Sequence, residues 1–293
     1  MSGTDETTDF DPLWDYDHPA ETETLFRERL AQAPAGSSYL AQLLTQIARA
    51  QGLQRQFRAA HETLDKAEAL LQPDWSRARI RCHLERGRVF NSAGHPEQAR
   101  PHFLAAWEQA VAAGADFYAI DAAHMIAIVE PPAAQTAWNL RAAALAEQSS
   151  DPRARNWPGS LYNNIGWTWH DQGDYPQALA FFEKALAWRE QQGSVAQMRI
   201  ARWCVARARR SLGDLETALA MQCALLAELE AAGESDRYVL EEIGECLLAL
   251  QRDPDEARRC FALAYAQMSQ DPWLAANEPE RLARLRQLGG VEA

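Results

Sequence analysis

The stretch SLYNNIGWTWHDQGDYPQALAFFEKAL, residues 160–186, carries two helical patterns on either side of a short turn. Its apolar and small residues return every three or four positions, the spacing typical of one face of an α-helix. These positions are Tyr162, Ile165, Gly166, Trp169, Ala178, Phe182 and Ala185. The letters GDYP at residues 173–176 interrupt the pattern with glycine and proline, which favour turns. The stretch therefore predicts two amphipathic helices joined by a tight turn.

The same spacing recurs along most of the chain. Each expected first helix contains one small residue at a comparable position: Ala48, Gly87, Ala123, Gly166, Ala206 and Gly244, at steps of 36–43 residues. A period of this length indicates stacked helical units, each packed against the next. A small residue at the crossing point lets the second helix of a pair approach the first closely.

The pattern in residues 160–186 resembles the tetratricopeptide repeat signature, W-x2-L-G-x2-Y followed by A-x3-F and a further alanine. The resemblance extends over residues 37–269 and is weakest at 116–148. The period exceeds the usual 34 residues, as in long-helix members such as kinesin light chain and bacterial peptide-sensing regulators. The resemblance implies an all-α, right-handed solenoid of helix pairs, with a concave groove lined by the first helices.

We expect one solenoid domain at residues 19–290, preceded by an acidic arm at residues 1–18. A capping helix is expected at 19–33 and a second at 277–288, with Asn277 and Glu280 as a capping pair. Between them we expect six repeats, the third of them degenerate, at 37–73, 77–113, 116–148, 157–192, 195–232 and 235–269.

The arm contains the letters DFDPLWDYD at residues 9–17, in which aromatic and acidic residues alternate. One interpretation is an acidic tail without fixed structure, whose aromatic residues are incidental. The other is that Leu13 and Trp14 pack on the first repeat while the acids meet nearby arginines. The sequence leaves both open.

Composition restricts the function further. A net charge of −12 disfavours nucleic-acid binding, which needs a basic surface. The 293 residues contain 27 Arg against two Lys, a bias typical of a GC-rich bacterial genome. Five cysteines without a C-x-x-C pair predict neither a disulfide framework nor a zinc site. No apolar run reaches the length of a membrane helix, and the N-terminus lacks the apolar segment of a signal peptide. We expect a soluble, cytoplasmic protein that does not bind membranes.

Polar and aromatic residues occupy the side of the first helices opposite the packed face, if each residue turns the helix by about 100°. Carrying these offsets from repeat to repeat predicts a peptide-binding groove. Its candidate site residues are Asn163, Asn164, Trp167, His170, Trp203, Arg207, Arg88 and His124. The same face is expected to present Gln46, Arg49, Arg81, Glu85, Asp121, Tyr238 and Glu242.

These residue types suit a peptide ligand. An asparagine amide offers a donor and an acceptor to a peptide unit, arginine pairs with carboxylates, and tryptophan gives rigid contact area. Asn164 stands at the position of an asparagine in the carboxylate clamp of chaperone-binding tetratricopeptide repeats. Ile200 and Cys204 replace the basic partners of that clamp, so binding of chaperone tails is not expected. An incidental exposed tryptophan at 167 is the simpler alternative.

No catalytic or cofactor motif accompanies this groove. His124 and His170 lie in successive repeats, too far apart for a shared metal, and each is more simply explained as a polar histidine with a partner. We therefore expect no metal, no cofactor and no enzymatic activity. The favoured function is a scaffold that binds a peptide segment of a partner protein. The alternative is a sensor of a small molecule or signalling peptide that regulates another protein. The sequence does not indicate the oligomeric state.

Overall fold

The computed structural model describes residues 10–292, and these form α-helices and two short 3-10 helices without any strand. The prediction of an all-α solenoid is confirmed, whereas its superhelical hand stays a prediction. Contacts group the chain into two compact units, residues 1–161 and residues 162–293, and each is described by itself. The expected single domain and its repeat boundaries likewise stay predictions.

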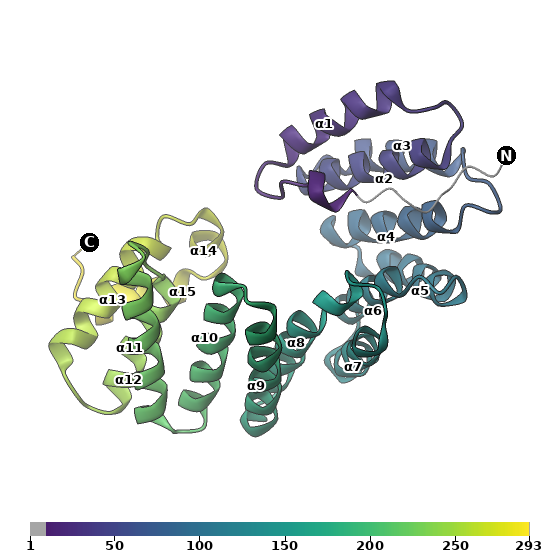
Figure 1. Ribbon diagram of the computed structural model, residues 1–293. Coiled ribbons are helices and arrows are strands. Elements are labelled where there is room, and N and C mark those ends of the chain that lie inside the picture. Colours follow the sequence, from purple (N-terminus) through teal and green to yellow (C-terminus); the bar gives the residue numbers. More distant parts are fainter. Residues whose placement is uncertain (1–9, 293) are drawn as a thin grey trace. The chain divides into compact units, whose positions relative to one another are not determined.

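Unit 1 is built from consecutive antiparallel helices that pack against their neighbours in the chain, from purple α1 to teal α7 (Figure 1). Among its first helices, α4 also contacts both α2 and α6 directly. The described elements are η1 (Asp11–Leu13), α1 (Pro19–Gln32), α2 (Ser38–Leu53), α3 (Phe57–Glu68), α4 (Ser76–Ser92), α5 (Pro96–Ala112), α6 (Asp116–Val129), α7 (Pro132–Gln148) and η2 (Ala154–Asn156).

Unit 2 continues the same arrangement from α9 to yellow α15 (Figure 1). Its helices are α8 (Pro158–Asp171), which begins in the last residues of unit 1, α9 (Tyr175–Gln192), α10 (Val195–Ser211), α11 (Leu215–Ala231), α12 (Arg237–Ala249), α13 (Pro254–Met268), α14 (Pro272–Asn277) and α15 (Pro279–Leu288). The first helices α10 and α12 contact each other across the pair boundary.

Helix pairs cross where the sequence places its small residues. A Cβ atom on Gly166 would lie 2.5 Å from the ring of Phe182, which is itself fully buried. Gly244 has the same relation to Phe261, at 2.9 Å. Such distances are far below van der Waals contact, so the ring packs directly on the backbone of the first helix. The glycine therefore sets the spacing within each of these pairs.

The turn between α8 and α9 shows how local sequence joins a pair. Gly173 has a φ of +79°, which a glycine adopts without steric cost. The Asp174 carboxylate then accepts a hydrogen bond from the backbone N–H of Gln177, at 3.1 Å, and so caps α9. Pro176 follows in the first turn, where its missing N–H costs nothing.

The C-terminal cap differs from the sequence prediction. Asn277 does not cap the last helix but is the final residue of α14, and its amide donates to the carbonyl of Trp273 at 2.8 Å. The last helix begins at Pro279, with Glu278 as a cap that makes no side-chain hydrogen bond. Because proline disfavours helical backbone in the residue before it, the chain breaks there into two short helices.

The described part of the N-terminal arm, residues 10–18, packs on unit 1. Phe10 is fully buried between Phe26 of α1 and Tyr39 of α2, and Leu13 and Trp14 pack on the same cluster. The docked interpretation therefore holds for Leu13 and Trp14. The expected contacts between acids and arginines are not seen at Asp15, which pairs with His18 instead, and residues 1–9 lie outside the described residues.

Three half-buried histidines lie together in unit 1. The Nδ1 atoms of His83 and His102 are 3.4 Å apart, and the ring of Phe90 lies against both His61 and His102. Burial lowers the pKa of all three below the ordinary value of 6.5. The fold therefore favours their neutral forms.

We predict that Gly166→Ala destabilises the chain by about 1–3 kcal/mol relative to Gly52→Ala, because the new methyl group meets the ring of Phe182. A Cβ at Gly52 meets only a methyl of Val89, at 3.4 Å, so the same substitution is tolerated there. Urea unfolding of both variants measures the difference. Equal changes in the two variants would show that the close crossing does not control the packing.

We also predict that stability falls as the pH drops from about 7.5 to about 5.5. A histidine with a lowered pKa in the fold binds its proton more readily when unfolded, so its contribution is complete above 6.5 and lost below it. The double variant His83→Gln/His102→Gln should flatten this slope of the urea midpoint against pH. His95→Gln, at an exposed histidine, should leave it unchanged. A slope as steep in the double variant as in the wild type contradicts the assignment. His61, His124 and His170, whose pKa values burial also lowers, account for the part of the slope that remains.

Candidate functional site

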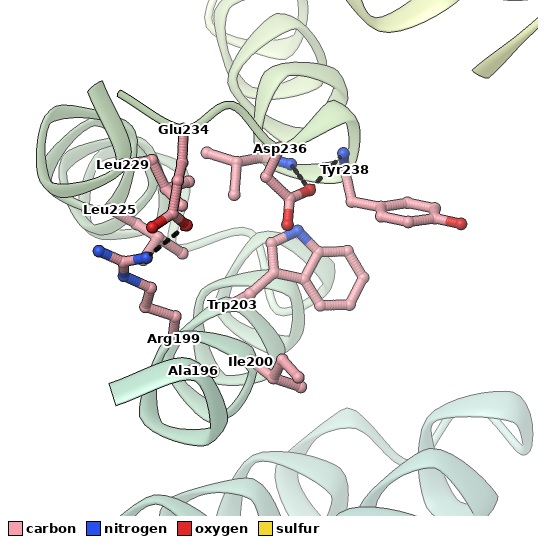
Figure 2. Close-up of a pocket in the computed structure, with 10 residues that line it drawn as sticks. Ala196, Arg199, Ile200, Trp203, Leu225, Leu229, Glu234, Asp236 and Tyr238 are labelled. Atoms are coloured by element: carbon pink, nitrogen blue, oxygen red, sulfur yellow. Dashed lines mark hydrogen bonds and ion pairs between the residues drawn. The ribbon is translucent and has the colours of Figure 1, made fainter. Parts of the chain in front are cut away.

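An apolar pocket opens between α10 and α12 in unit 2. Its cavity volume is about 490 Å³, and Figure 2 shows the side chains that line it. We name it the α10–α12 pocket, and its residues are Ala196, Arg199, Ile200, Trp203, Leu225, Leu229, Glu234, Asp236, Tyr238 and Val239. A concave, mostly apolar cavity with a few polar groups at its edge is the usual form of a binding site.

The walls of the pocket come from three helices. Leu225 and Leu229 of α11 and Val239 of α12 are buried and belong to the core of unit 2. Trp203 of α10 and Tyr238 of α12 pack partly on that core, with ring centroids 6.1 Å apart. The bottom of the pocket is thus formed by the core of unit 2, between α10 and α12.

Ile200 is the most unusual residue of the pocket. It is a large aliphatic residue, yet 59% of its surface is exposed. A large aliphatic side chain held in water is unfavourable by roughly 1.5–3 kcal/mol relative to burial. A ligand that covers Ile200 would recover part of that free energy.

Charged groups at the edge of the pocket are paired within the protein. Arg199 donates from Nη1 to Glu234 at 2.8 Å, and both side chains face the pocket in Figure 2. Asp236 caps α12 by accepting hydrogen bonds from the backbone N–H groups of Tyr238 and Val239, at 2.8 and 3.3 Å. The indole Nε1 of Trp203 is buried without a hydrogen-bond partner in the described structure and is directed toward Asp236 (Figure 2).

A row of aromatic rings leads from the pocket to α8. The centroid of Trp167 lies 5.9 Å from that of Trp203 and 5.2 Å from that of Phe182. Trp167 is therefore partly a packing residue, which the helical arithmetic did not predict. His170 lies 5.1 Å from Trp167 and completes the row.

The polar candidates on α8 contact α10. Asn163 accepts a hydrogen bond from the thiol of Cys204, at 3.2 Å, and Nε2 of His170 lies 3.0 Å from the hydroxyl of Ser211. Burial, reinforced by Arg207, lowers the pKa of His170, so its ring is neutral near pH 7. The half-buried Asn164 accepts a hydrogen bond at its backbone carbonyl from the hydroxyl of Thr168. The structure thus brings these residues to one side of α8 and α10.

Arg207 is held by a buried carboxylate. Its Nε lies 3.1 Å from Glu242 of α12, and Arg210 pairs with the same carboxylate at 2.7 Å. Burial lowers the pKa of Arg207, with Glu242 opposing that shift. A ligand carboxylate would have to compete with Glu242 for this guanidinium.

The remaining two candidates lie in unit 1. Arg88 stands between Glu85, at 2.7 Å, and Asp121, at 2.5 Å, and these carboxylates raise its pKa against the effect of burial. His124 is packed against Trp157 and hydrogen-bonded to Asn139, and burial lowers its pKa. Six of the predicted site residues therefore lie in unit 2 and two in unit 1.

The described residues contain no group of three His, Cys, Asp or Glu side chains placed to hold a metal ion. Burial raises the pKa of the Cys204 thiol to about 12, so it is not a nucleophile near neutral pH. None of the described helices combines the length and the apolarity of a membrane span.

Comparison with known proteins identifies the repeat. Residues 159–191 match the tetratricopeptide repeat family. No curated protein matches the chain in sequence. The chain thus carries a tetratricopeptide repeat, and the solved structures below give it the fold of tetratricopeptide repeat proteins.

Three of these structures are informative. BtubC from P. vanneervenii is 15% identical with a TM-score of 0.59, over 77% of this chain and 92% of BtubC. A STAND signal transduction ATPase with a tetratricopeptide repeat sensor, from Pyrococcus horikoshii, is 15% identical with a TM-score of 0.69, and the match covers 94% of this chain but only 43% of the ATPase. The apo quorum sensor NprR from B. thuringiensis is 14% identical with a TM-score of 0.58, over 94% and 82% of the two chains.

Helical arithmetic found Trp203 and Tyr238 but missed the rest of the pocket. Leu225 and Leu229 belong to a second helix, and the groove was predicted from first helices alone. Ile200 did give a signal, because it replaces a basic residue of the carboxylate clamp. An aliphatic residue in that place indicates an apolar rather than an anionic ligand.

We predict that Glu242→Gln destabilises the chain by about 1–3 kcal/mol. The substitution leaves Arg207 and Arg210 without their carboxylate, and breaking a buried pair costs more than this where the partners are fully enclosed. Glu216→Gln, which breaks an exposed pair with Arg252, should change stability by less than about 0.5 kcal/mol. Urea unfolding distinguishes them, and equal losses would mean that Glu242 does not hold the two arginines.

Proposed function

We propose that the chain is a non-enzymatic protein-interaction module that binds a peptide segment of a partner in the α10–α12 pocket. The observation that carries this proposal is the exposure of Ile200 beside Trp203 and Tyr238, above a floor of core leucines. Binding energy in protein interfaces concentrates where an aromatic or aliphatic anchor fills such a pocket. The fold supports the proposal, because tetratricopeptide repeats present extended surfaces made by successive first helices.

The ligand is a segment with a large apolar side chain that enters the pocket. Its backbone would continue over the first-helix face of α8 and α10, where we propose that Asn163, Asn164, Trp167, His170 and Arg207 line its path. These side chains already interact within the protein. They would therefore bind a peptide by fitting its surface and through their amide groups more than through an unpaired charge. Arg88 and His124 lie in unit 1, and their part in the same site stays a prediction.

Binding through an apolar side chain differs from binding the C-terminal carboxylate of a partner. A terminal carboxylate needs unpaired cations, whereas Arg199 and Arg207 are both paired with glutamates. The pocket therefore favours an internal peptide segment. We also propose a cytoplasmic location, because free cysteines such as Cys82 and Cys204 are typical of a reducing compartment.

A second function in the same class is the sensing of a signalling peptide. NprR has been solved in complex with its cognate peptide NprX, and that structure matches 97% of this chain at 16% identity and a TM-score of 0.56. A sensor would bind a short free peptide and change its interaction with another protein, whereas a scaffold would bind a segment within a folded partner. Both use the α10–α12 pocket.

We predict that substitutions in the pocket weaken peptide binding by tenfold or more. The probe is a peptide enriched from a random dodecapeptide library on the wild-type protein, with its affinity measured by fluorescence anisotropy. Ile200→Ser and Trp203→Ala should each lose at least a factor of ten, about 1.4 kcal/mol.

Val195→Ser is the matched control, because Val195 is 56% exposed on the same helix but does not line the pocket. It should bind the peptide as the wild type does. Enriched peptides that bind equally to Ile200→Ser and wild type would place the site elsewhere and refute the proposal. Circular dichroism checks that each variant is folded.

A further inference from the structure

The N-terminal arm lies across the first-helix face of unit 1. The indole Nε1 of Trp14 donates to the side-chain carbonyl of Gln46 on α2, at 3.0 Å. The η1 turn, purple in Figure 1, lies alongside α2. Gln46 stands where the sequence predicts a ligand-facing residue of the first repeat, so the arm occupies a position at which a bound peptide is expected.

Arginines of two successive first helices contact the aromatic rings of the arm. The guanidinium of Arg49 on α2 lies 5.4 Å from the ring centroid of Trp14 and 5.3 Å from that of Tyr16. Arg81 on α4 lies 5.0 Å from the centroid of Phe10. Each contact is within the range of a cation–π interaction. The arm therefore bridges two repeats, as a peptide ligand of a solenoid does.

The structure also holds these arginines in place without the arm. Arg81 donates from Nε to the hydroxyl of Tyr118 on α6, at 3.0 Å, and Arg49 lies 3.6 Å from the buried carboxylate of Glu85. Both guanidinium groups thus have partners in unit 1 other than the arm, so we expect them to keep their positions when the arm leaves. We name this surface, formed by Phe26, Tyr39, Gln46, Arg49 and Arg81, the arm-binding face.

We propose that the arm-binding face is a second peptide-binding surface, that residues 10–16 occupy it as a tethered ligand, and that a partner segment with the aromatic spacing of Phe10, Trp14 and Tyr16 competes with them. The proposal concerns unit 1 and does not depend on the α10–α12 pocket.

The arm is suited to release. Among the arm side chains whose burial the structure describes, Phe10 is the one fully buried; Trp14 is half-buried, and Tyr16 is 53% exposed. The arm joins α1 directly at Pro19, so its local concentration at the face is of the order of millimolar. An intrinsically weak contact is then sufficient to keep the face occupied, and a tighter partner segment can still replace it.

The experiment measures binding of a fluorescein-labelled peptide of residues 10–18, FDPLWDYDH, to full-length protein by anisotropy. The triple variant Phe10→Ala/Trp14→Ala/Tyr16→Ala removes the three aromatic side chains that hold the arm. It should release the arm and bind the peptide at least tenfold more tightly than wild type does. Adding Arg49→Gln to the released variant should abolish binding. Adding Arg58→Gln, at a surface arginine of α3 that is 93% exposed, should not.

Three outcomes overturn the proposal. The peptide does not bind the released variant, in which case the arm is only a structural cap; it binds wild type and released variant equally; or Arg49→Gln leaves binding intact. The single variant Phe10→Ala provides a second, partly released variant, and circular dichroism establishes that each protein is folded. If the released variant binds the peptide while Ile200→Ser does not alter that affinity, the two sites are separate.

Discussion

The close approach of a phenylalanine ring to a glycine backbone fixes the geometry of the helix pairs. Gly166 and Phe182 in one pair, and Gly244 and Phe261 in another, leave no room for a Cβ atom between them. Because the phenylalanine ring packs on one side of the first helix, the opposite side of that helix faces away from its partner helix. This division of α8 and α12 into two sides places the side chains of these helices that a ligand could contact.

The sides of the first helices that face away from their partner helices carry charged side chains, and many of these form ion pairs with one another. Arg88 joins Glu85 to Asp121 across α4 and α6, and Arg210 joins α10 to Glu242 on α12. Pairs of this kind hold neighbouring repeats in register, since a partner shifted by one turn would leave a half-buried charge alone. They also explain why the binding proposed for the α10–α12 pocket depends on Ile200 and Trp203, since Arg199 and Arg207 beside them are already paired with glutamates.

Periodic spacing predicted the helices, the close crossings and the face that carries Trp203, because each depends on contacts within one repeat. The sequence could not predict that Arg207 would be taken by Glu242, or that Trp167 would rest on Phe182, because these contacts depend on how far each side chain reaches. The sequence also could not predict whether the N-terminal arm docks. Phe10 packs between Phe26 and Tyr39, which lie on different helices, and the spacing of residues along the chain does not show that these two rings meet.

The α10–α12 pocket is a gap between two layers of a stack, and this gives its occupant a mechanical role. In a solenoid each repeat contacts only its neighbours. The angle between two successive helix pairs therefore changes more easily than the packing within one pair. A ligand side chain seated against Trp203 and Tyr238 would widen the gap between α10 and α12 and change this angle. Because α13 packs on α12 and α15 packs on α13, both helices would turn with α12, so the size of the ligand side chain would set the angle.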